Sequence, residues 1–286
     1  MTGRIVFCLC LLLVTSVQAS VIRVADDDGQ ILEFTRPPQR IISLAPHLTE
    51  LLFAVGAGAQ VVGADTASTY PAAAKALPRV GDYSRVNFER ILALKPDLVV
   101  VWTGGTRAAD IHGLEKLGVP VMHTQAARLS DVARLLRLIG QASGHAQEGE
   151  AAAQDYSARL SALQVRDRRE APLRVFYQVW DRPLITVGGR HWISEALTLC
   201  GARNVFADLR GASPVVSREA VLRRAPALIV SGRDAPDARR QWQQFVSLPA
   251  VENRAFVRVN ADLLHRPTPR LVEGVTELCA ALAPYR

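Results

Sequence analysis

Cysteine is scarce in this 286-residue chain, which contains only four cysteines. That number is too small for a disulfide-dense scaffold, and 19 glycines and 16 prolines are too few for a fibrous or low-complexity protein. Hydrophobic residues make up 49% and charged residues 21%, values that exclude an extended disordered chain. The length predicts one or two globular domains.

Motifs that would identify an enzyme are also missing. The chain contains no Walker A loop, HExxH, CxxC or G-x-S-x-G motif. Gly56 and Gly58 follow an expected helix rather than a strand, and the third glycine of a dinucleotide-binding motif is absent. A metal site would need three or four converging ligands, for which His47, His191 and His265 are the candidates. We expect neither an enzyme nor a resident metal or cofactor.

The positive charge is spread out rather than concentrated. Lysine and arginine number 34 against 27 acidic residues, for a net charge of +7. Nucleic-acid-binding proteins usually cluster their basic residues, whereas the densest run here is Arg166, Arg168 and Arg169. The pattern predicts a diffusely basic surface and no nucleic-acid partner.

The first 19 residues have the organisation of a secretory signal peptide. Arg4 precedes an apolar run over 5–14, and small residues around Ala19 provide a cleavage site. The apolar run is shorter than the roughly 20 residues needed to span a bilayer. We expect cleavage after Ala19 and an exported protein, in which Cys200 and Cys279 remain. Because exported proteins meet an oxidising environment, these two predict a disulfide if the fold brings them together.

Strand-like and helix-like segments alternate after an N-terminal hairpin. This alternation predicts an α/β protein with parallel sheets covered by helices. The segment 146–170 differs, because it is rich in Ala, Gln, Glu and Arg and predicts a long connecting helix. We therefore expect an N-terminal lobe over 20–145 and a C-terminal lobe over 171–286. The expected strands are 21–24, 31–34, 41–45, 61–64, 98–102, 119–123, 174–179, 227–231 and 256–259, and the expected helices of the first lobe are 46–55, 87–94, 108–117 and one capped by Ser130.

Two segments nearly repeat each other, one in each half. Residues 87–100 and 217–230 share a helix cap, an acid, an apolar face, a proline and a strand, with seven residues from Glu89 to Pro96 and from Glu219 to Pro226. This near-repeat predicts two related Rossmann-like lobes with parallel-rich central sheets, joined by one backbone helix, with a ligand cleft between them. Taken alone, each glutamate is a favourable acid at the positive end of a helix.

The same segments, NFERILALKPDLVVVW and SREAVLRRAPALIV, together with the paired cysteines, resemble the periplasmic cobalamin-binding proteins of ABC importers. The similarity extends from about Arg40 to Leu282. It implies a monomeric carrier that captures a corrinoid between its lobes and delivers it to an inner-membrane importer. In that family one glutamate from each lobe docks on the transmembrane subunits, and the matching residues are Glu89 and Glu219. The family disulfide maps onto Cys200 and Cys279.

The resemblance also implies a set of ligand-binding residues. A corrinoid site should offer aromatic surfaces and a few polar donors rather than a catalytic constellation. Two residues depart from the family pattern: Ala67 replaces an aromatic residue, and His265 replaces an acid. The residues in matching cleft positions are Tyr83, Trp102, Asp262 and Arg266, to which we add Trp180, His191 and Trp192 from expected loops of the second lobe.

Haem- or siderophore-binding proteins of the same superfamily are the alternative. The stretch from Val62 to Pro78 would also suit a haem binder. His47 or Tyr70 could then ligate iron, since both residue types are known haem ligands. His47 could equally form a hydrogen bond in the cleft.

Overall fold

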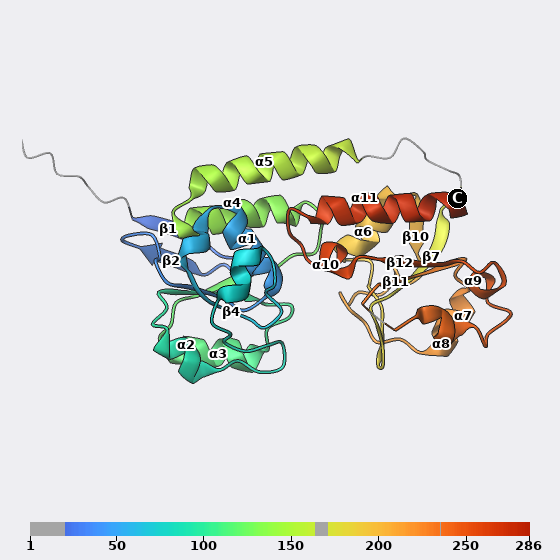
Figure 1. The fold of residues 1–286 in the computed structure, drawn as a ribbon, viewed down its shortest axis with the longest axis horizontal. Coiled ribbons are helices and arrows are strands. Elements are labelled where there is room, and N and C mark those ends of the chain that lie inside the picture. Colours follow the sequence, from blue (N-terminus) through green and yellow to red (C-terminus); the bar gives the residue numbers. More distant parts are fainter. Residues whose placement is uncertain (1–20, 164–170, 235) are drawn as a thin grey trace, which may run out of the picture.

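The computed structural model describes residues 21–163, 171–234 and 236–286. The expected signal peptide therefore lies outside the described residues, as does the end of the expected connecting helix. The described chain forms an α/β protein of two halves, each with its own parallel sheet (Figure 1). This confirms the predicted fold class.

The N-terminal lobe is built on a parallel sheet of four strands in the order β4-β3-β5-β6. Side chains alternate between its two faces, so that Val100 packs with α1 and α4 while Val99 and Val101 pack with α2 and α3. The strands are β3 (Ile41–Ser43), β4 (Val61–Ala64), β5 (Leu98–Trp102) and β6 (Val121–Thr124), and the helices are α1 (Pro46–Ala54), α2 (Phe88–Ala93), α3 (Ala108–Lys116) and α4 (Asp131–Ser143).

The C-terminal lobe repeats this plan with parallel strands in the order β10-β7-β11-β12. Helices α6 and α11 cover one face of the sheet, and α7, α8 and α9 cover the other. The elements are β7 (Leu173–Gln178), β8 (Trp180–Asp181), β9 (Leu184–Ile185), α6 (Trp192–Leu199), β10 (Ala202–Asn204), α7 (Arg218–Arg224), β11 (Leu228–Gly232), α8 (Ala238–Trp242), α9 (Pro249–Glu252), β12 (Phe256–Val259), α10 (Ala261–Leu264) and α11 (Leu271–Leu282).

An antiparallel hairpin of β1 (Ile22–Ala25) and β2 (Ile31–Phe34) precedes the first lobe. Its acidic turn is tied to β6, because Asp26 Oδ2 accepts a hydrogen bond from the His123 backbone N–H at 2.9 Å. The Asp27 backbone N–H also donates to the His123 carbonyl. The turn is thus a structural clamp between the hairpin and the sheet.

A helix, α5 (Ala146–Ala162), leads from the first lobe toward the second and packs along α4. Two glycines permit this close approach, because a Cβ on Gly140 would lie 2.9 Å from the Gly149 Cα. The predicted connecting helix therefore begins at Ala146, and 164–170 lie outside the described residues. In Figure 1, α5, α4 and α11 run along the same side of the molecule.

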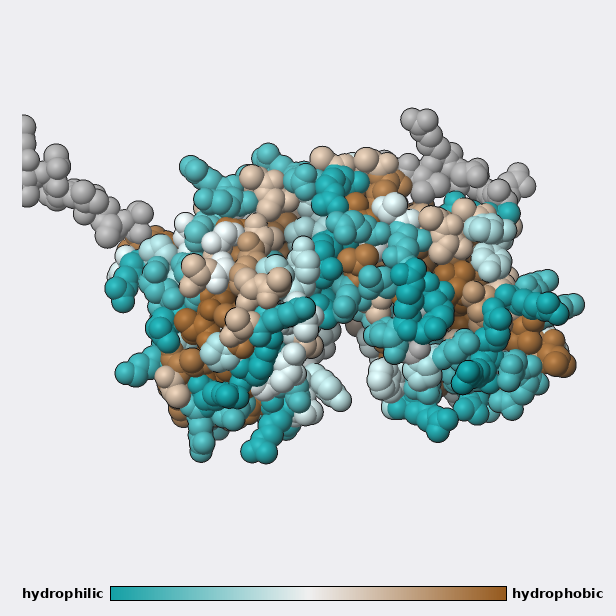
Figure 2. Space-filling model, in the orientation of Figure 1, coloured by the Kyte–Doolittle hydropathy of each residue, from teal (hydrophilic) through white to brown (hydrophobic). Residues whose placement is uncertain are grey.

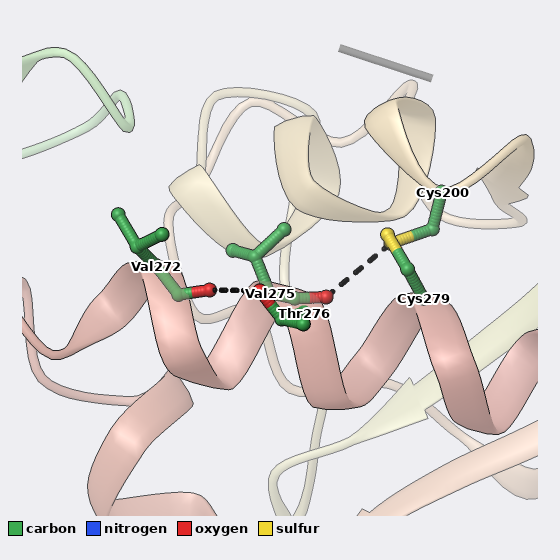
Figure 3. Close-up of a disulfide and its surroundings, with 5 residues drawn as sticks. All are labelled: Cys200, Val272, Val275, Thr276 and Cys279. Carbon is green, nitrogen blue, oxygen red and sulfur yellow. Dashed lines mark hydrogen bonds between the residues drawn. A yellow bond between two sulfur atoms is a disulfide. The ribbon is translucent and has the colours of Figure 1, made fainter. Parts of the chain in front are cut away.

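The predicted disulfide is confirmed. Cys200, at the end of α6, is bonded to Cys279 of α11, and their Cα atoms lie 4.7 Å apart (Figure 3). The bond joins the two helices that cover the same face of the second sheet. It closes a loop of 79 residues, which stabilises the fold by about 4–5 kcal/mol on the chain-entropy model.

Two local predictions need correction. Ser130 precedes α4 but its side chain forms no capping bond; Asp131 Oδ2 instead accepts from the backbone N–H groups of Ala127 and Arg128, both at 2.8 Å. Strand β6 begins at Val121 rather than Val119, since Pro120 has no N–H for the ladder. Within the described ranges, no helix is both long and apolar enough to cross a membrane.

Candidate ligand-binding cleft

A cleft separates the two lobes on the side opposite α5. Figure 2 shows it as a notch between the two halves of the molecule. The loops that follow β3, β5 and β6 approach it from the first lobe, and those that follow β7 and β12 approach it from the second. Ligands of open α/β sheets commonly bind beyond the carboxyl ends of the strands. The predicted site residues on these loops can therefore be placed one by one.

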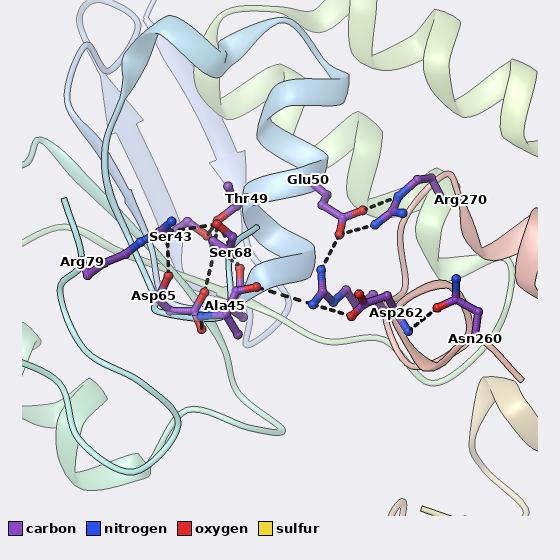
Figure 4. A network of polar contacts seen from close by, with 12 residues as sticks. Ser43, Ala45, Thr49, Glu50, Asp65, Ser68, Arg79, Asn260, Asp262 and Arg270 are labelled. Atoms are coloured by element: carbon purple, nitrogen blue, oxygen red, sulfur yellow. Dashed lines mark hydrogen bonds and ion pairs between the residues drawn. The ribbon is translucent and has the colours of Figure 1, made fainter. Parts of the chain in front are cut away.

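A buried ion-pair cluster bridges the lobes at one end of the cleft. Glu50 of α1 has a side chain only 2% exposed, and its Oε1 lies 3.0 Å from Arg266 Nη1 and 2.8 Å from Arg270 Nη2. Arg270 Nε also donates to Glu50 Oε2 at 3.0 Å, which makes this pair bidentate (Figure 4). Because both arginines belong to the second lobe, the cluster holds the two lobes together across their boundary.

Asp262 and Arg266, both predicted to bind ligand, pair with each other. Asp262 Oδ1 lies 2.6 Å from Arg266 Nη2, and the Asp262 side chain remains 61% exposed. The Arg266 guanidinium is mostly buried; it donates hydrogen bonds to Glu50 Oε1 and to the Ala67 carbonyl, and forms an ion pair with Asp262. The exposed Asp262 carboxylate is the member of this ion pair that a ligand or solvent can reach.

Tyr83 and Trp102, both predicted to bind ligand, line the same small cavity of about 80 Å³ in the first lobe. Tyr83 is 88% exposed, whereas Trp102 is half-buried at the end of β5. The indole packs on Gly105, where an added Cβ would meet the Trp102 ring at 2.1 Å. Glycine at position 105 thus allows this ring orientation.

A buried polar network, which sequence reasoning missed, includes Asp65 of the same cavity lining (Figure 4). Thr49 Oγ1 bonds to Ser43 Oγ at 2.9 Å and to Ser68 Oγ at 2.7 Å, and Ser68 donates to Asp65. Burial raises the pKa of the Asp65 carboxyl, although the bond from Ser68 opposes this shift. Arg79 Nη1 donates to the carbonyls of Asp65 and Ser68, so the network fixes the loop after β4.

Three histidines surround the cleft. His47 is 3% exposed and packs edge-on against Trp102 at 5.2 Å between ring centroids, with its Nε2 lacking a partner among the described residues. His265 Nε2 lies 2.8 Å from Tyr177 Oη, and burial lowers the pKa of His265. His191 caps α6 by accepting at Nδ1 from the Ile193 N–H.

Two of these histidines have strongly lowered pKa values. Burial, together with the charge of Arg266, lowers the pKa of His47 to about 3. Burial, together with the neighbouring His265, lowers the pKa of His191 to about 3.

These lowered pKa values predict a specific pH dependence of stability. In the unfolded chain both imidazoles titrate near 6.5, so between about pH 6.5 and 3 the unfolded state binds protons that the folded state does not. The free energy of unfolding should therefore be highest above pH 6.5 and fall as the pH is lowered through this range. Each histidine should account for a loss of about 2 kcal/mol between pH 7.5 and pH 5.0.

Urea unfolding at these two pH values measures the effect. His47→Phe should reduce the pH-dependent loss by the share of one histidine, while the exposed His112→Phe should leave it unchanged. An unchanged loss in the His47→Phe variant would contradict the assignment.

The other aromatic candidates, Trp180, Trp192 and Tyr70, differ in their exposure. Trp180, expected on a loop, begins the short ribbon β8–β9 and is 52% exposed. Trp192, also expected on a loop, is instead the first residue of α6 and a core residue, because its Nε1 donates to the Leu264 carbonyl at 2.9 Å and its ring is buried. Tyr70 is covered on one face by the Arg270 guanidinium, 3.7 Å from the ring centroid.

No group of three or more His, Cys, Asp or Glu residues in 21–163, 171–234 and 236–286 is arranged to hold a metal ion. The three histidines of the cleft are therefore not brought together as a common ligand set. Their chemistry at neutral pH is that of uncharged hydrogen-bonding groups.

The two repeated glutamates occupy equivalent positions. Glu89 is the second residue of α2, whose cap Asn87 accepts from the Arg90 N–H, and Glu219 is the second residue of α7, whose cap Ser217 accepts from the Ala220 N–H. Both side chains are exposed. The Ser217 hydroxyl and the backbone N–H at the start of α7 lower the pKa of Glu219. In Figure 1, α2 and α7 lie on the side of their lobes away from α5.

Two α/β lobes, each with its own parallel sheet and with a cleft between them, have the architecture of a two-lobed solute-binding protein. Residues 41–261 match the family model described as periplasmic binding protein. The chain belongs to the periplasmic binding protein family.

Individual relatives narrow the comparison. The chain is 37% identical over 244 residues to the vitamin B12-binding protein of Vibrio parahaemolyticus, covering 85% of this chain and 89% of the relative. The crystal structure of the periplasmic vitamin B12-binding protein of Vibrio cholerae superimposes with a TM-score of 0.78 at 36% identity, covering 87% of this chain and 98% of the other. A periplasmic haem-binding protein from Pseudomonas aeruginosa gives a TM-score of 0.73 at 28% identity, with 86% and 93% covered.

Proposed function

We propose that this protein is a periplasmic carrier that binds cobalamin between its lobes and delivers it to an inner-membrane ABC importer. The main support for this proposal is the similarity, over most of both chains, to proteins named for vitamin B12 binding. The described cleft is compatible with this cargo, since it presents aromatic surface from Tyr83 and Trp102 and an exposed carboxylate from Asp262. A carrier of this kind releases its cargo unchanged and is not an enzyme.

Haem is the second candidate cargo, because haem-binding proteins share the fold at lower identity. A haem iron would need an axial ligand, for which Tyr70 and His47 are the candidates. His47 Nε2 is buried and the ring packs edge-on against Trp102, so this imidazole presents no accessible ligand atom. Tyr70 is 45% exposed but is held on one face by the Arg270 guanidinium, so it is the one of these two residues that could reach a haem iron.

Calorimetric titration of residues 20–286 with cyanocobalamin, and separately with haemin, tests the proposal. We expect saturable one-to-one binding of cyanocobalamin and none of haemin. Binding of haemin alone would keep the fold and replace the cargo. Binding of neither would reject both.

The aromatic wall carries a second expectation. Trp102→Ala removes a large apolar surface, so cyanocobalamin affinity should fall by about 10- to 100-fold, at 1.4 kcal/mol per factor of ten. Tyr83→Ala should weaken binding less, because the Tyr83 side chain is 88% exposed and contributes less to the cavity wall than the Trp102 ring does. Tyr285→Ala, which changes an exposed aromatic residue outside the predicted binding set, is the control. Unchanged affinity in the Trp102→Ala variant would contradict the placement of the cargo.

The delivery step depends on the repeated acids. Glu89 and Glu219 are the proposed docking residues, one for each transmembrane subunit of the importer. Their exposure, matched caps and shared side of the molecule support this role. Export to the periplasm, with cleavage after Ala19, and a monomeric state complete the proposal.

A further inference from the structure

A basin of about 670 Å³ opens at one edge of the cleft, between the loop that precedes α4 and the segment that precedes α6. Three arginines line it, Arg128 from the first lobe and Arg190 and Arg203 from the second. All three are exposed, and within the part of the chain that the structure describes none has an ion-pair partner. Three unpaired guanidinium groups around one hollow create a strongly positive local field.

The acidic lining does not cancel this charge. Glu195 is the one acid among the described lining residues, and its Oε2 already accepts a hydrogen bond from the Leu129 N–H at 2.8 Å. That bond crosses between the lobes and ties the Arg128 loop to α6. With three arginines and one glutamate, the lining carries a net charge of +2. The bond between Leu129 and Glu195 also fixes the distance between the two sides of the basin.

His191 adds a neutral donor to the same basin. Its Nδ1 accepts a hydrogen bond from the Ile193 N–H at 3.1 Å, so the ring proton of the neutral imidazole belongs on Nε2. The residue is 7% exposed and lines the basin, and Nε2 has no hydrogen-bond partner among the described residues. This N–H is not fully enclosed, so it can donate to an acceptor that enters the basin.

The wall that carries His191 is internally braced. The buried Asn204 side chain donates to the Val187 carbonyl and to Ser194 Oγ, both at 2.8 Å. Ser194 Oγ in turn donates to the Gly188 carbonyl at 2.7 Å. These bonds fix the segment before α6, so the donors around the basin are set in place before a ligand arrives.

We propose that this basin is an oxyanion subsite that binds the phosphodiester of the nucleotide arm of the corrinoid. The inference rests on the proposed cobalamin function and adds to it a determinant of which corrinoid is preferred. Guanidinium groups form short, charge-assisted hydrogen bonds to phosphate oxygens, and the start of α6 contributes its positive end. The basin adjoins the second-lobe side of the cleft, since Trp192, the residue after His191, donates from Nε1 to the carbonyl of Leu264, the residue before His265.

The test compares cyanocobalamin, which carries the phosphodiester, with dicyanocobinamide, which lacks the nucleotide arm. Calorimetry of the wild-type chain should show tighter binding of cyanocobalamin. The triple variant Arg128→Ala, Arg190→Ala, Arg203→Ala should lose about 10- to 100-fold in cyanocobalamin affinity, the range of charge-assisted hydrogen bonds, and keep its dicyanocobinamide affinity within twofold. A control with the same charge change, Arg36→Ala, Lys75→Ala, Lys116→Ala, alters exposed residues outside the basin lining and should change neither.

A third titration, with inorganic phosphate alone, separates the sources of the oxyanion. Phosphate that binds the wild-type chain and not the Arg128 triple variant would place an oxyanion site in the basin even if no corrinoid binds, in which case the proposed function fails and the subsite stands. Equal losses for both corrinoids, or unchanged cyanocobalamin affinity in the triple variant without phosphate binding to the wild type, would overturn the subsite while leaving the proposed function intact.

Discussion

Replacing Glu50 by alanine should lower the free energy of unfolding by about 3–5 kcal/mol, the cost of leaving a buried charge without its partner. The carboxylate is almost fully enclosed between Arg266 and Arg270. Arg266 retains its ion pair with Asp262 after the substitution, whereas Arg270 keeps its stacking on Tyr70 but, among the described residues, has no other ion-pair partner within 4 Å. Most of the loss should therefore come from the uncompensated Arg270 guanidinium. Urea unfolding at pH 7.5 measures it.

Two further variants make this expectation decisive. Glu273→Ala breaks the exposed ion pair with Arg159 between α5 and α11, and should cost less than about 1 kcal/mol. The double variant Glu50→Leu, Arg270→Met removes the carboxylate and the more isolated charge together, and should recover most of the stability. A Glu50→Ala loss as small as that of Glu273→Ala would show that solvent already screens the cluster.

Replacing both docking acids, Glu89→Ala with Glu219→Ala, should abolish cobalamin delivery to the importer while leaving cobalamin affinity within twofold. Both side chains are exposed and lie outside the cleft lining, so their loss removes charge from the docking surface alone. Uptake of labelled cyanocobalamin into vesicles that contain the importer measures delivery, and calorimetry measures affinity.

A matched pair tests whether delivery depends on these positions or on net charge. Glu148→Ala with Glu252→Ala removes the same charge from exposed helical sites and should leave uptake intact. Each docking variant alone should reduce uptake without abolishing it. Normal uptake by the Glu89, Glu219 double variant would reject the docking assignment, and so would weakened affinity with normal uptake.

Local signals carried much of the fold prediction. Asn87 and Ser217 each precede an apolar repeat and do cap α2 and α7, because capping depends on neighbours within one turn. Strand β10 was missed, since three residues around the exposed Arg203 give no apolar run. Trp192 was taken for a loop residue because aromatic side chains suit both clefts and cores, and only its bond to Leu264 places it in the core.

The cross-lobe cluster had no comparable signal. Glu50 lies in an apolar helix, PHLTELLFA, and could have been a solvent-facing residue. Its partners are 216 and 220 residues away in the chain, so its burial depends on how the two lobes pack. The one hint in the sequence is that Glu50 is the single acidic residue of a helix in which Leu48, Leu51, Leu52 and Phe53 are apolar. The arginine basin is likewise assembled from both lobes, and no local pattern unites Arg128 with Arg203.

The order of the two sheets along the chain affects how an exported protein would assemble. All strands of the first sheet lie within 41–124, and all strands of the second lie within 173–259. Each lobe can therefore complete its own sheet from one contiguous stretch of chain, without strands from the other lobe. The Glu50 cluster differs, because its acid lies in the first lobe and its two arginines lie in the second. The cluster can form only when both lobes are folded and in contact, so it reports on the joining of the lobes rather than on the folding of either one.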